Sequence, residues 1–272
     1  MPILHAIVLG IVQGFTEFLP ISSSGHLILV PWLFGWDDFA GNPGLEKTFD
    51  VALHVGTLVG VVAYFRHDLV RLAAAAFGRP KSPDGRLAWL LLVSAVPAAI
   101  TGALLADFIE EKTGAIWLIG VMLIVFALVL YWADRLPGDR SIDEYRLKDA
   151  LATGVGQALA LQPGVSRSGV TITVGRVRRF NRDSAARISF LMSLPIIAGA
   201  ILFSGLDVMT EGGIPSDFIA PFVWGIAASA VSGWFAVWAT LKIIRTHTFT
   251  PFVIYRIALG VVVLALAATP WR

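Results

Sequence analysis

The chain has 272 residues, of which 56% are hydrophobic and only 15% are charged, and its mean hydropathy is +0.75. Soluble domains carry about 25% charged residues, so this composition excludes an ordinary soluble protein and predicts an integral membrane protein. The formal net charge of +2 is too small to indicate nucleic-acid binding, and the absence of cysteine excludes disulfides and thiolate metal sites.

Two apolar segments, residues 3–34 and 148–178, are each interrupted by a polar turn rich in Pro, Ser and Gly. We predict that each forms a re-entrant helical hairpin, since non-helical backbone at membrane depth is tolerated only where protein buries it or where it lines a watery cavity. Paired breaks of this kind point to a binding site near the membrane midplane. The turns match at a fixed offset of 144 residues: Gln13 aligns with Gln157, Ser22 with Ser166, Ser24 with Ser168 and Gly25 with Gly169.

Six further apolar runs are long enough to cross a membrane: 49–66, 87–106, 115–134, 187–206, 218–241 and 251–270. The predicted fold is therefore an all-α polytopic membrane protein, a single membrane domain over 1–272 with six transmembrane helices and two re-entrant helical hairpins. Each half, 1–134 and 148–272, contains one hairpin and three crossings. Because three is odd, the second half is predicted to be inverted relative to the first, which makes an inverted-topology repeat.

The connections between these spans alternate between those with many Lys and Arg residues and those with few. Sixteen of the 21 fall in four connections: 66–86, 135–148, 176–187 and 242–250. Three fall in the other set: 35–48, 107–114, 207–217 and the C-terminal tail. The positive-inside rule makes the first set cytoplasmic, so both termini lie outside, the first hairpin enters from outside and the second enters from the cytoplasm. The arginines of 176–187 are predicted to anchor the chain to anionic lipid.

Arg167 and Arg256 are the two basic residues left within the predicted membrane segments. An ionisable residue in such a segment is a functional hypothesis by default. Arg167 lies in the second turn between two serines, which favours a role in a site. For Arg256, near the start of the last span, snorkelling to the cytoplasmic surface is an equally good interpretation.

Gln13 and Glu17 are four residues apart, so they share one face of a helix. An unpaired acid within a bilayer costs roughly 2.5–3.5 kcal/mol, so we expect Glu17 to be neutral, paired with Arg167 or bound to a cation. His26 follows Ser23 by three residues, and a histidine there could act as a base, an acid or a nucleophile.

The serines of both turns precede apolar half-helices, where they are candidate N-caps. A helix N-terminus is also an anion site, and an arginine beside two such termini suits a phosphate group. Charge stabilisation, a nucleophile and a proton shuttle are the ingredients of phosphoryl transfer. Asp50 and His54, near the start of the first full span, lie either in this site or at the outer surface.

The stretch Glu17–His26 reads Glu-Phe-Leu-Pro-Ile-Ser-Ser-Ser-Gly-His, and Pro163–Thr171 reads Pro-Gly-Val-Ser-Arg-Ser-Gly-Val-Thr. They resemble the two signature motifs of the undecaprenyl-pyrophosphate phosphatase family, also called the bacitracin-resistance protein family. The resemblance extends through Thr48–Gly56 to Pro251–Arg256. It implies an enzyme of the bacterial inner membrane that hydrolyses undecaprenyl pyrophosphate at the outer side, recycles the lipid carrier for cell-wall synthesis and confers bacitracin resistance.

The resemblance assigns catalytic roles to Glu17, Ser23, His26 and Arg167, with Arg167 as the pyrophosphate clamp. We expect Ser23 to be the nucleophile and His26 its base, because their spacing lets them meet across one helical turn. Attack by His26 or by a water molecule stays open. The expected pyrophosphate-binding residues are Gln13, Ser22, Ser24, Ser166, Ser168 and Thr171.

The resemblance also implies a divalent cation, Mg²⁺ or Ca²⁺, held by Glu17 with Gln13. The acidic motif of the family begins with Glu or Gln, and the Gln form found here leaves one carboxylate fewer for a metal. The expected partners are a polyprenyl pyrophosphate lipid and the bacterial inner membrane, with no nucleic acid and with a homodimer left open.

The alternative function is transport, in which the chain moves or flips a polyprenyl-phosphate lipid. Inverted repeats with broken helices are more often transporters than enzymes. A nucleophile and a base beside an arginine favour hydrolysis instead. A purely structural role leaves Glu17, His26 and Arg167 unexplained.

Overall fold

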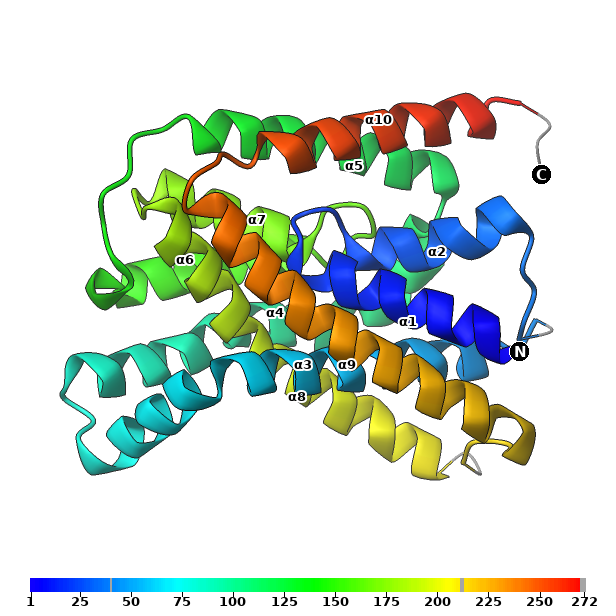
Figure 1. The fold of residues 1–272 in the computed structure, drawn as a ribbon, viewed down its shortest axis with the longest axis horizontal. Helices are drawn as coiled ribbons and strands as arrows, with labels where there is room; N and C mark the ends of the chain where they lie inside the picture. Colours follow the sequence, from blue (N-terminus) through cyan, green and yellow to red (C-terminus); the bar gives the residue numbers. More distant parts are fainter. Residues whose placement is uncertain (40, 211–212, 270–272) are drawn as a thin grey trace.

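The computed structural model describes most of the chain: residues 1–39, 41–210 and 213–269, without the side chains of 106–112, 204 and 206–210. Within the described residues the chain is helical and contains no β-strand, which confirms the all-α fold class. The helices are α1 (Ile3–Phe18), α2 (Ser23–Phe34), α3 (Pro43–Gly78), α4 (Pro83–Thr113), α5 (Ile116–Asp134), the 3-10 helix η1 (Ile142–Glu144), α6 (Leu147–Leu159), α7 (Arg167–Val177), α8 (Arg182–Thr210), α9 (Ser216–Ile244) and α10 (Thr250–Ala267) (Figure 1).

Six helices are long and apolar enough to cross a membrane: α3, α4, α5, α8, α9 and α10. They confirm the six predicted spans, although α3 covers Pro43–Gly78 rather than 49–66. Its start is fixed by Asn42, which caps the helix with its side chain, and by the proline that follows. The predicted end of the last span, residue 270, lies outside the described residues, and α10 ends at Ala267.

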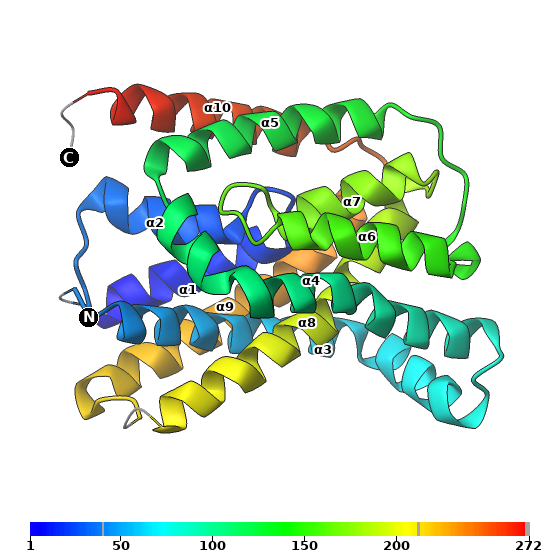
Figure 2. The same ribbon diagram turned by 180° about the vertical axis from the view of Figure 1, so that it is seen from behind.

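The helices run between two ends of the molecule, as the opposite views in Figures 1 and 2 show. The turns between α3 and α4, α5 and α6, α7 and α8, and α9 and α10 lie at one end (left in Figure 1). The N-terminus, the turns from α2 to α3 and from α4 to α5, and the end of α10 lie at the other. The pairs α1–α2 and α6–α7 instead turn back in the middle. Re-entrant hairpins require this course, but their placement in a membrane stays a prediction.

Close contact between small residues joins α1 of the first half to α9 of the second. A Cβ atom added at Gly14 would lie 2.6 Å from the backbone N of Gly233 and 2.7 Å from the carbonyl oxygen of Ser229. In the second half α6 packs on α4, where a Cβ added at Gly154 would lie 2.6 Å from the carbonyl oxygen of Ser94. Lipid is as apolar as these helices, so their association depends on such close packing.

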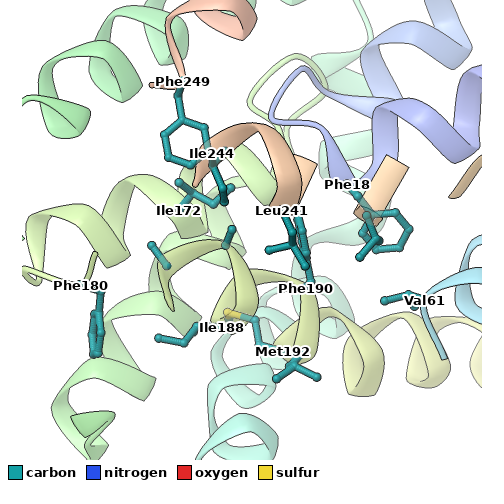
Figure 3. Close-up of a cluster of buried hydrophobic side chains, with 14 of the residues drawn as sticks. Phe18, Val61, Ile172, Phe180, Ile188, Phe190, Met192, Leu241, Ile244 and Phe249 are labelled. Carbon is teal, nitrogen blue, oxygen red and sulfur yellow. The ribbon is translucent and has the colours of Figure 1, made fainter. Parts of the chain in front are cut away.

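Buried apolar side chains from several helices form a cluster, part of which is drawn in Figure 3. Phe18 of α1 packs edge-on against Phe190 of α8, with ring centroids 5.6 Å apart. Ile172 of α7 and Leu241 of α9 belong to the same cluster. Because Phe18 directly follows Glu17, the cluster fixes the end of α1 that carries the candidate acid.

Two carboxylates, those of Asp134 and Asp149, bind the arginines near the end of α7. Arg182 Nε lies 2.6 Å from Asp134 Oδ1, and Arg178 Nε lies 2.7 Å from Asp149 Oδ1. Arg176 is only 4% exposed and donates to the carbonyl oxygen of Asp134 at 3.2 Å. The predicted lipid anchor is therefore wrong for Arg176, because acids of neighbouring segments bind these arginines. Burial alone would raise the pKa of Asp149, but hydrogen bonds from arginines lower it below its usual value.

Gly14→Ala is expected to destabilise the protein, since the added methyl group meets backbone atoms of α9 that cannot rotate away. Overpacking of this kind costs about 1–3 kcal/mol. Gly199→Ala is the matched control, because no described atom lies within 4 Å of the Cβ it adds and alanine favours a helix. The measurement is the thermal unfolding midpoint in detergent. An unchanged midpoint in Gly14→Ala would contradict the close contact of α1 with α9.

Candidate active site

The turns between α1 and α2 and between α6 and α7 share an unusual backbone geometry. Ser22 and Ser166 have φ values of 79° and 74°, in the left-handed region that residues other than glycine rarely adopt. Each caps the half-helix that follows: Ser22 Oγ accepts from the N–H of Gly25 at 3.4 Å, and Ser166 Oγ accepts from the N–H of Gly169 at 3.1 Å. Such strain costs of order 1–3 kcal/mol per residue and persists only where the surroundings fix the conformation.

The two turns are also bonded to each other. The N–H of Gly164 in the second turn donates to Ser22 Oγ at 3.1 Å, and Ser168 Oγ donates to the carbonyl oxygen of Leu19 in the first turn at 2.9 Å. Figures 1 and 2 show both turns together in the middle of the molecule. The N-termini of α2 and α7, where the first N–H groups have no partner within the helix, are therefore brought to one place.

Arg256 of α10 holds both turns from inside the protein. Its side chain is completely buried, at 0% exposure, so the snorkelling interpretation is wrong. The guanidinium group donates to carbonyl oxygens of the first turn, the second turn and α5: those of Pro20 (3.2 Å), Gly164 (2.8 Å), Val165 (3.0 Å), Met122 (3.4 Å) and Leu123 (3.2 Å). The planar fork of an arginine can serve several acceptors at once, which an ammonium group does less well.

Glu17 lies at the centre of the candidate site and is buried. Arg167 Nη2 lies 2.6 Å from its Oε1, which is the ion pair that the sequence left as one of three options. Its Oε2 accepts hydrogen bonds from Ser23 Oγ at 2.5 Å and from Gln13 Nε2 at 3.1 Å. His54 Nε2 approaches the same oxygen at 3.7 Å. The structure therefore brings together an acid, a hydroxyl, a guanidinium and an imidazole.

His26 is placed differently from the sequence-based expectation. Its Nδ1 donates to the carbonyl oxygen of Ser22 at 2.6 Å, and its Nε2 lies 2.7 Å from the hydroxyl of Tyr255. A carbonyl oxygen only accepts, so the neutral ring carries its proton on Nδ1 and accepts from Tyr255 at Nε2. The expected hydrogen bond with Ser23 is not formed, because both ring nitrogens are engaged elsewhere.

The other expected phosphate-binding hydroxyls stabilise the turns. Ser166 Oγ and Ser168 Oγ lie 3.2 Å apart, and both side chains are buried. Thr171 Oγ1 donates to the carbonyl oxygen of Arg167 at 2.8 Å and lies 2.7 Å from Ser189 Oγ. Direct contact of these residues and of Ser22 with a phosphate stays a prediction. Ser24, by contrast, is exposed.

His54 and Tyr255 are the residues near the site that sequence reasoning left open or missed. His54 was placed either at the surface or in the site, and the structure puts it in contact with Glu17. Tyr255 directly precedes the buried Arg256, and no local pattern in the sequence connects it with His26. Its ring stacks on that imidazole with centroids 5.7 Å apart.

A hard cation bound beside Glu17 would have one carboxylate as a ligand and would need its other ligands from groups that are not acids. Among the described residues no group of three or more His, Cys, Asp and Glu side chains could hold a metal ion. However, Gln13 Oε1 is buried and has no hydrogen-bond partner within the described part of the chain. An amide oxygen beside a single carboxylate suits Mg²⁺ or Ca²⁺, which commonly complete their shells with water and substrate phosphates. The residues present therefore fit the expected ion.

Comparison with known proteins agrees with this geometry. The family model described as "Bacitracin resistance protein BacA" matches residues 6–262. The chain belongs to this family. It is 48% identical over 264 residues to an undecaprenyl-diphosphatase of Desulforudis audaxviator (strain MP104C), covering 97% of each chain. It is 47% identical over 274 residues to an undecaprenyl-diphosphatase of Geobacter sulfurreducens (strain ATCC 51573 / DSM 12127 / PCA), covering 97% of this chain and 98% of the relative. The resemblance of the two motifs is thereby confirmed.

Arg256→Lys is expected to lower stability although it keeps the positive charge. A lysine cannot replace a fork that serves five carbonyl oxygens, and each buried acceptor left without a donor costs about 1–3 kcal/mol. Arg66→Lys is the matched control, since Arg66 is exposed and donates to one carbonyl oxygen of its own helix. We would compare thermal unfolding midpoints in detergent. Equal midpoints for the two variants would show that Arg256 does not hold the turns.

Proposed function

We propose that this membrane protein hydrolyses undecaprenyl pyrophosphate to undecaprenyl phosphate and phosphate. The observation that carries the proposal is the bonded chain of Ser23, Glu17 and Arg167 at the meeting point of the two turns. The names of its relatives give the substrate, and this chain covers 97% of the relative from Desulforudis audaxviator. A nucleophile, an acid that accepts its proton and a guanidinium group match phosphoryl transfer.

Ser23 is the proposed nucleophile and Glu17 its base. The Ser23 hydroxyl donates to Glu17 Oε2 at 2.5 Å, so its proton passes to that carboxylate as Oγ attacks the terminal phosphorus. The bond between this phosphorus and the bridging oxygen breaks, and undecaprenyl phosphate leaves with the proton that Glu17 had taken. A water molecule then attacks the phosphoserine while Glu17, again a carboxylate, takes a proton from it. That proton passes to Ser23 Oγ as the bond between Oγ and phosphorus breaks, and phosphate is released. In this mechanism His26 does not take part in the bond changes, and it positions α2 through its hydrogen bond to the carbonyl oxygen of Ser22.

Arg167 is the proposed pyrophosphate clamp. Its side chain is 13% exposed, while the Glu17 side chain is 5% exposed, so the guanidinium group is the more accessible partner of the pair. A pyrophosphate offers several oxygens to a planar fork and can compete with Glu17 for it. Release of the ion pair would leave Glu17 free to take the proton of Ser23. The exposed Ser24 and N–H groups at the two helix N-termini would add further hydrogen bonds.

A divalent cation, Mg²⁺ or Ca²⁺, is part of the proposal, with Glu17 and Gln13 as the residues that would hold it. When bound, such an ion neutralises charge on the phosphate oxygens and makes phosphorus easier to attack. Gln13 contributes the buried Oε1 atom, which has no hydrogen-bond donor among the described residues, and its Nε2 orients the carboxylate through a 3.1 Å hydrogen bond.

We further propose that the halves 1–134 and 148–272 are inverted repeats whose hairpins enter the bacterial inner membrane from opposite sides. Support comes from the course of α1–α2 and α6–α7, which turn back in the middle from opposite ends (Figure 1). The end with 16 of the 21 Lys and Arg residues would be cytoplasmic, with both termini and the mouth of the site outside. Recycling of the lipid carrier and bacitracin resistance would follow from hydrolysis at that face. A homodimer stays a prediction.

The orientation can be tested with single cysteines, because the chain has none of its own. Asn42→Cys and Lys81→Cys place one exposed thiol at each end of the molecule. In intact cells freed of the outer membrane, a membrane-impermeant maleimide is expected to label residue 42 and to label residue 81 only after lysis. Labelling in the reverse order would overturn the proposed orientation.

Transport of a polyprenyl-phosphate lipid is the second candidate, favoured by the two broken helix pairs that meet in the middle. Phosphate release in detergent, where no compartments exist, distinguishes the two functions. An enzyme releases phosphate under these conditions, whereas a transporter moves nothing that can be measured.

Ser23→Ala and Arg167→Ala are each expected to lower phosphate release from undecaprenyl pyrophosphate by at least about 100-fold, as loss of a group that stabilises the transition state does. A chelator should likewise abolish release by the wild type. The measurement is phosphate release by purified protein in detergent, with the unfolding midpoint as control for folding. Arg66→Lys, at an exposed position of α3 twelve residues after His54, should retain full activity. If Arg167→Ala still released phosphate at the wild-type rate, Arg167 would not be the pyrophosphate clamp.

A further inference from the structure

His54 lies beside Glu17 but has no part in the mechanism above. The distance of 3.7 Å between its Nε2 and Glu17 Oε2 is too long for a direct hydrogen bond. It is also too short for a bridging water molecule, which with two hydrogen bonds of about 2.8 Å separates its partners by more than 4 Å. The separation is within the range of an ion pair between the two side chains, and it also leaves room for a cation, because two metal–ligand bonds of about 2.1 Å together exceed it.

The ring of His54 is oriented as a metal ligand would be. Its Nδ1 donates to the carbonyl oxygen of Asp50, four residues earlier in α3, at 2.7 Å. Since a carbonyl oxygen only accepts, the proton of the neutral imidazole lies on Nδ1, and a lone pair on Nε2 faces the Glu17 carboxylate. Metal-binding histidines characteristically donate their second N–H to a carbonyl or carboxylate oxygen in this way.

The side chain of Gln13, which contacts Glu17, carries a further electron pair. Gln13 Oε1 is buried without a hydrogen-bond donor among the described residues, and the Nε2 atom of the same amide donates to Glu17 Oε2. Arg167 binds the other oxygen of that carboxylate, Oε1. The oxygen atom that faces His54, Oε2, is bound by Ser23 and Gln13 rather than by the guanidinium group, so a cation would take the place of one of these two donors. His54 itself is 33% exposed, so an ion can reach it from solution.

We infer that His54 is a ligand of the divalent cation, together with Glu17 and Gln13. The inference builds on the proposed function, which places a cation at Glu17, and adds a nitrogen to a site of oxygens. Oxygen ligands alone suit Mg²⁺ and Ca²⁺, whereas imidazole favours first-row transition metals. The site is therefore expected to bind Mn²⁺ more tightly than Ca²⁺, a preference that the acidic motif by itself does not provide.

The test is pulsed electron paramagnetic resonance of Mn²⁺ bound to the full-length, untagged protein in detergent. Coordination by an imidazole nitrogen modulates the Mn²⁺ spin echo, and we expect this ¹⁴N modulation in the wild type and its loss in His54→Gln. The dissociation constant for Mn²⁺ should rise at least roughly tenfold in the variant, since changes even in outer-shell partners cost that much. Ca²⁺ affinity should change less. His67→Gln, an exposed histidine of the same helix, should leave both readouts unchanged.

Absence of ¹⁴N modulation in a wild type that binds Mn²⁺, its persistence in His54→Gln, or no Mn²⁺ binding at all would each overturn the inference. The wild-type spectrum decides the matter even if His54→Gln fails to fold, and His54→Asn provides a second variant. Ser23→Ala separates the inference from the proposed function, since it should lose phosphate release and keep the nitrogen signal. A wild type with the nitrogen signal but no phosphate release would refute the proposed function alone.

Discussion

The guanidinium group of Arg256 is the contact on which both turns depend. Irregular backbone within a membrane exposes carbonyl oxygens that no helix satisfies and that water does not reach. One completely buried side chain supplies donors to carbonyl oxygens of both turns and of α5. The carbonyl groups point their oxygen atoms toward the guanidinium group, so their dipoles stabilise its buried positive charge, which has no carboxylate partner among the described residues. The two helix breaks can therefore lie side by side inside the protein, and the strained serines Ser22 and Ser166 stay in place.

The buried and the accessible polar groups have different tasks. Ser22, Ser166 and Ser168 are almost completely buried and bind backbone groups or each other, so they shape the turns. Ser23 and Arg167, which follow the two capping serines directly, both point to Glu17. A rigid frame thus surrounds a few reactive side chains, which is the arrangement that precise positioning for catalysis requires.

Much of this organisation could be read from the sequence, because it depends on local pattern. Apolar runs, paired breaks and capping serines predicted the spans and the turns, and an acid within a membrane segment gave pairing with Arg167 as one of three options. The sequence could not reveal contacts between distant segments. His26 lies 229 residues from Tyr255, and nothing near either residue indicates that their rings meet. The expected pairing of Ser23 with His26 failed because helical spacing brings two residues near each other but does not direct the side chains.

The shared offset of the two turns has a mechanical consequence. Residue 23 plus the offset of 144 gives residue 167, so the hydroxyl and the guanidinium group occupy one equivalent position, the first residue of a half-helix, in the two halves. Residue 161, the counterpart of Glu17, is a leucine, so only one of the two equivalent positions became acidic. The distance from Arg167 to Ser23 and Glu17 is therefore set by how the two halves pack together, whereas Ser23 and Glu17 both belong to the first half. A membrane whose thickness or lateral pressure shifts one half against the other would change this distance, and with it the geometry that the site offers to a pyrophosphate.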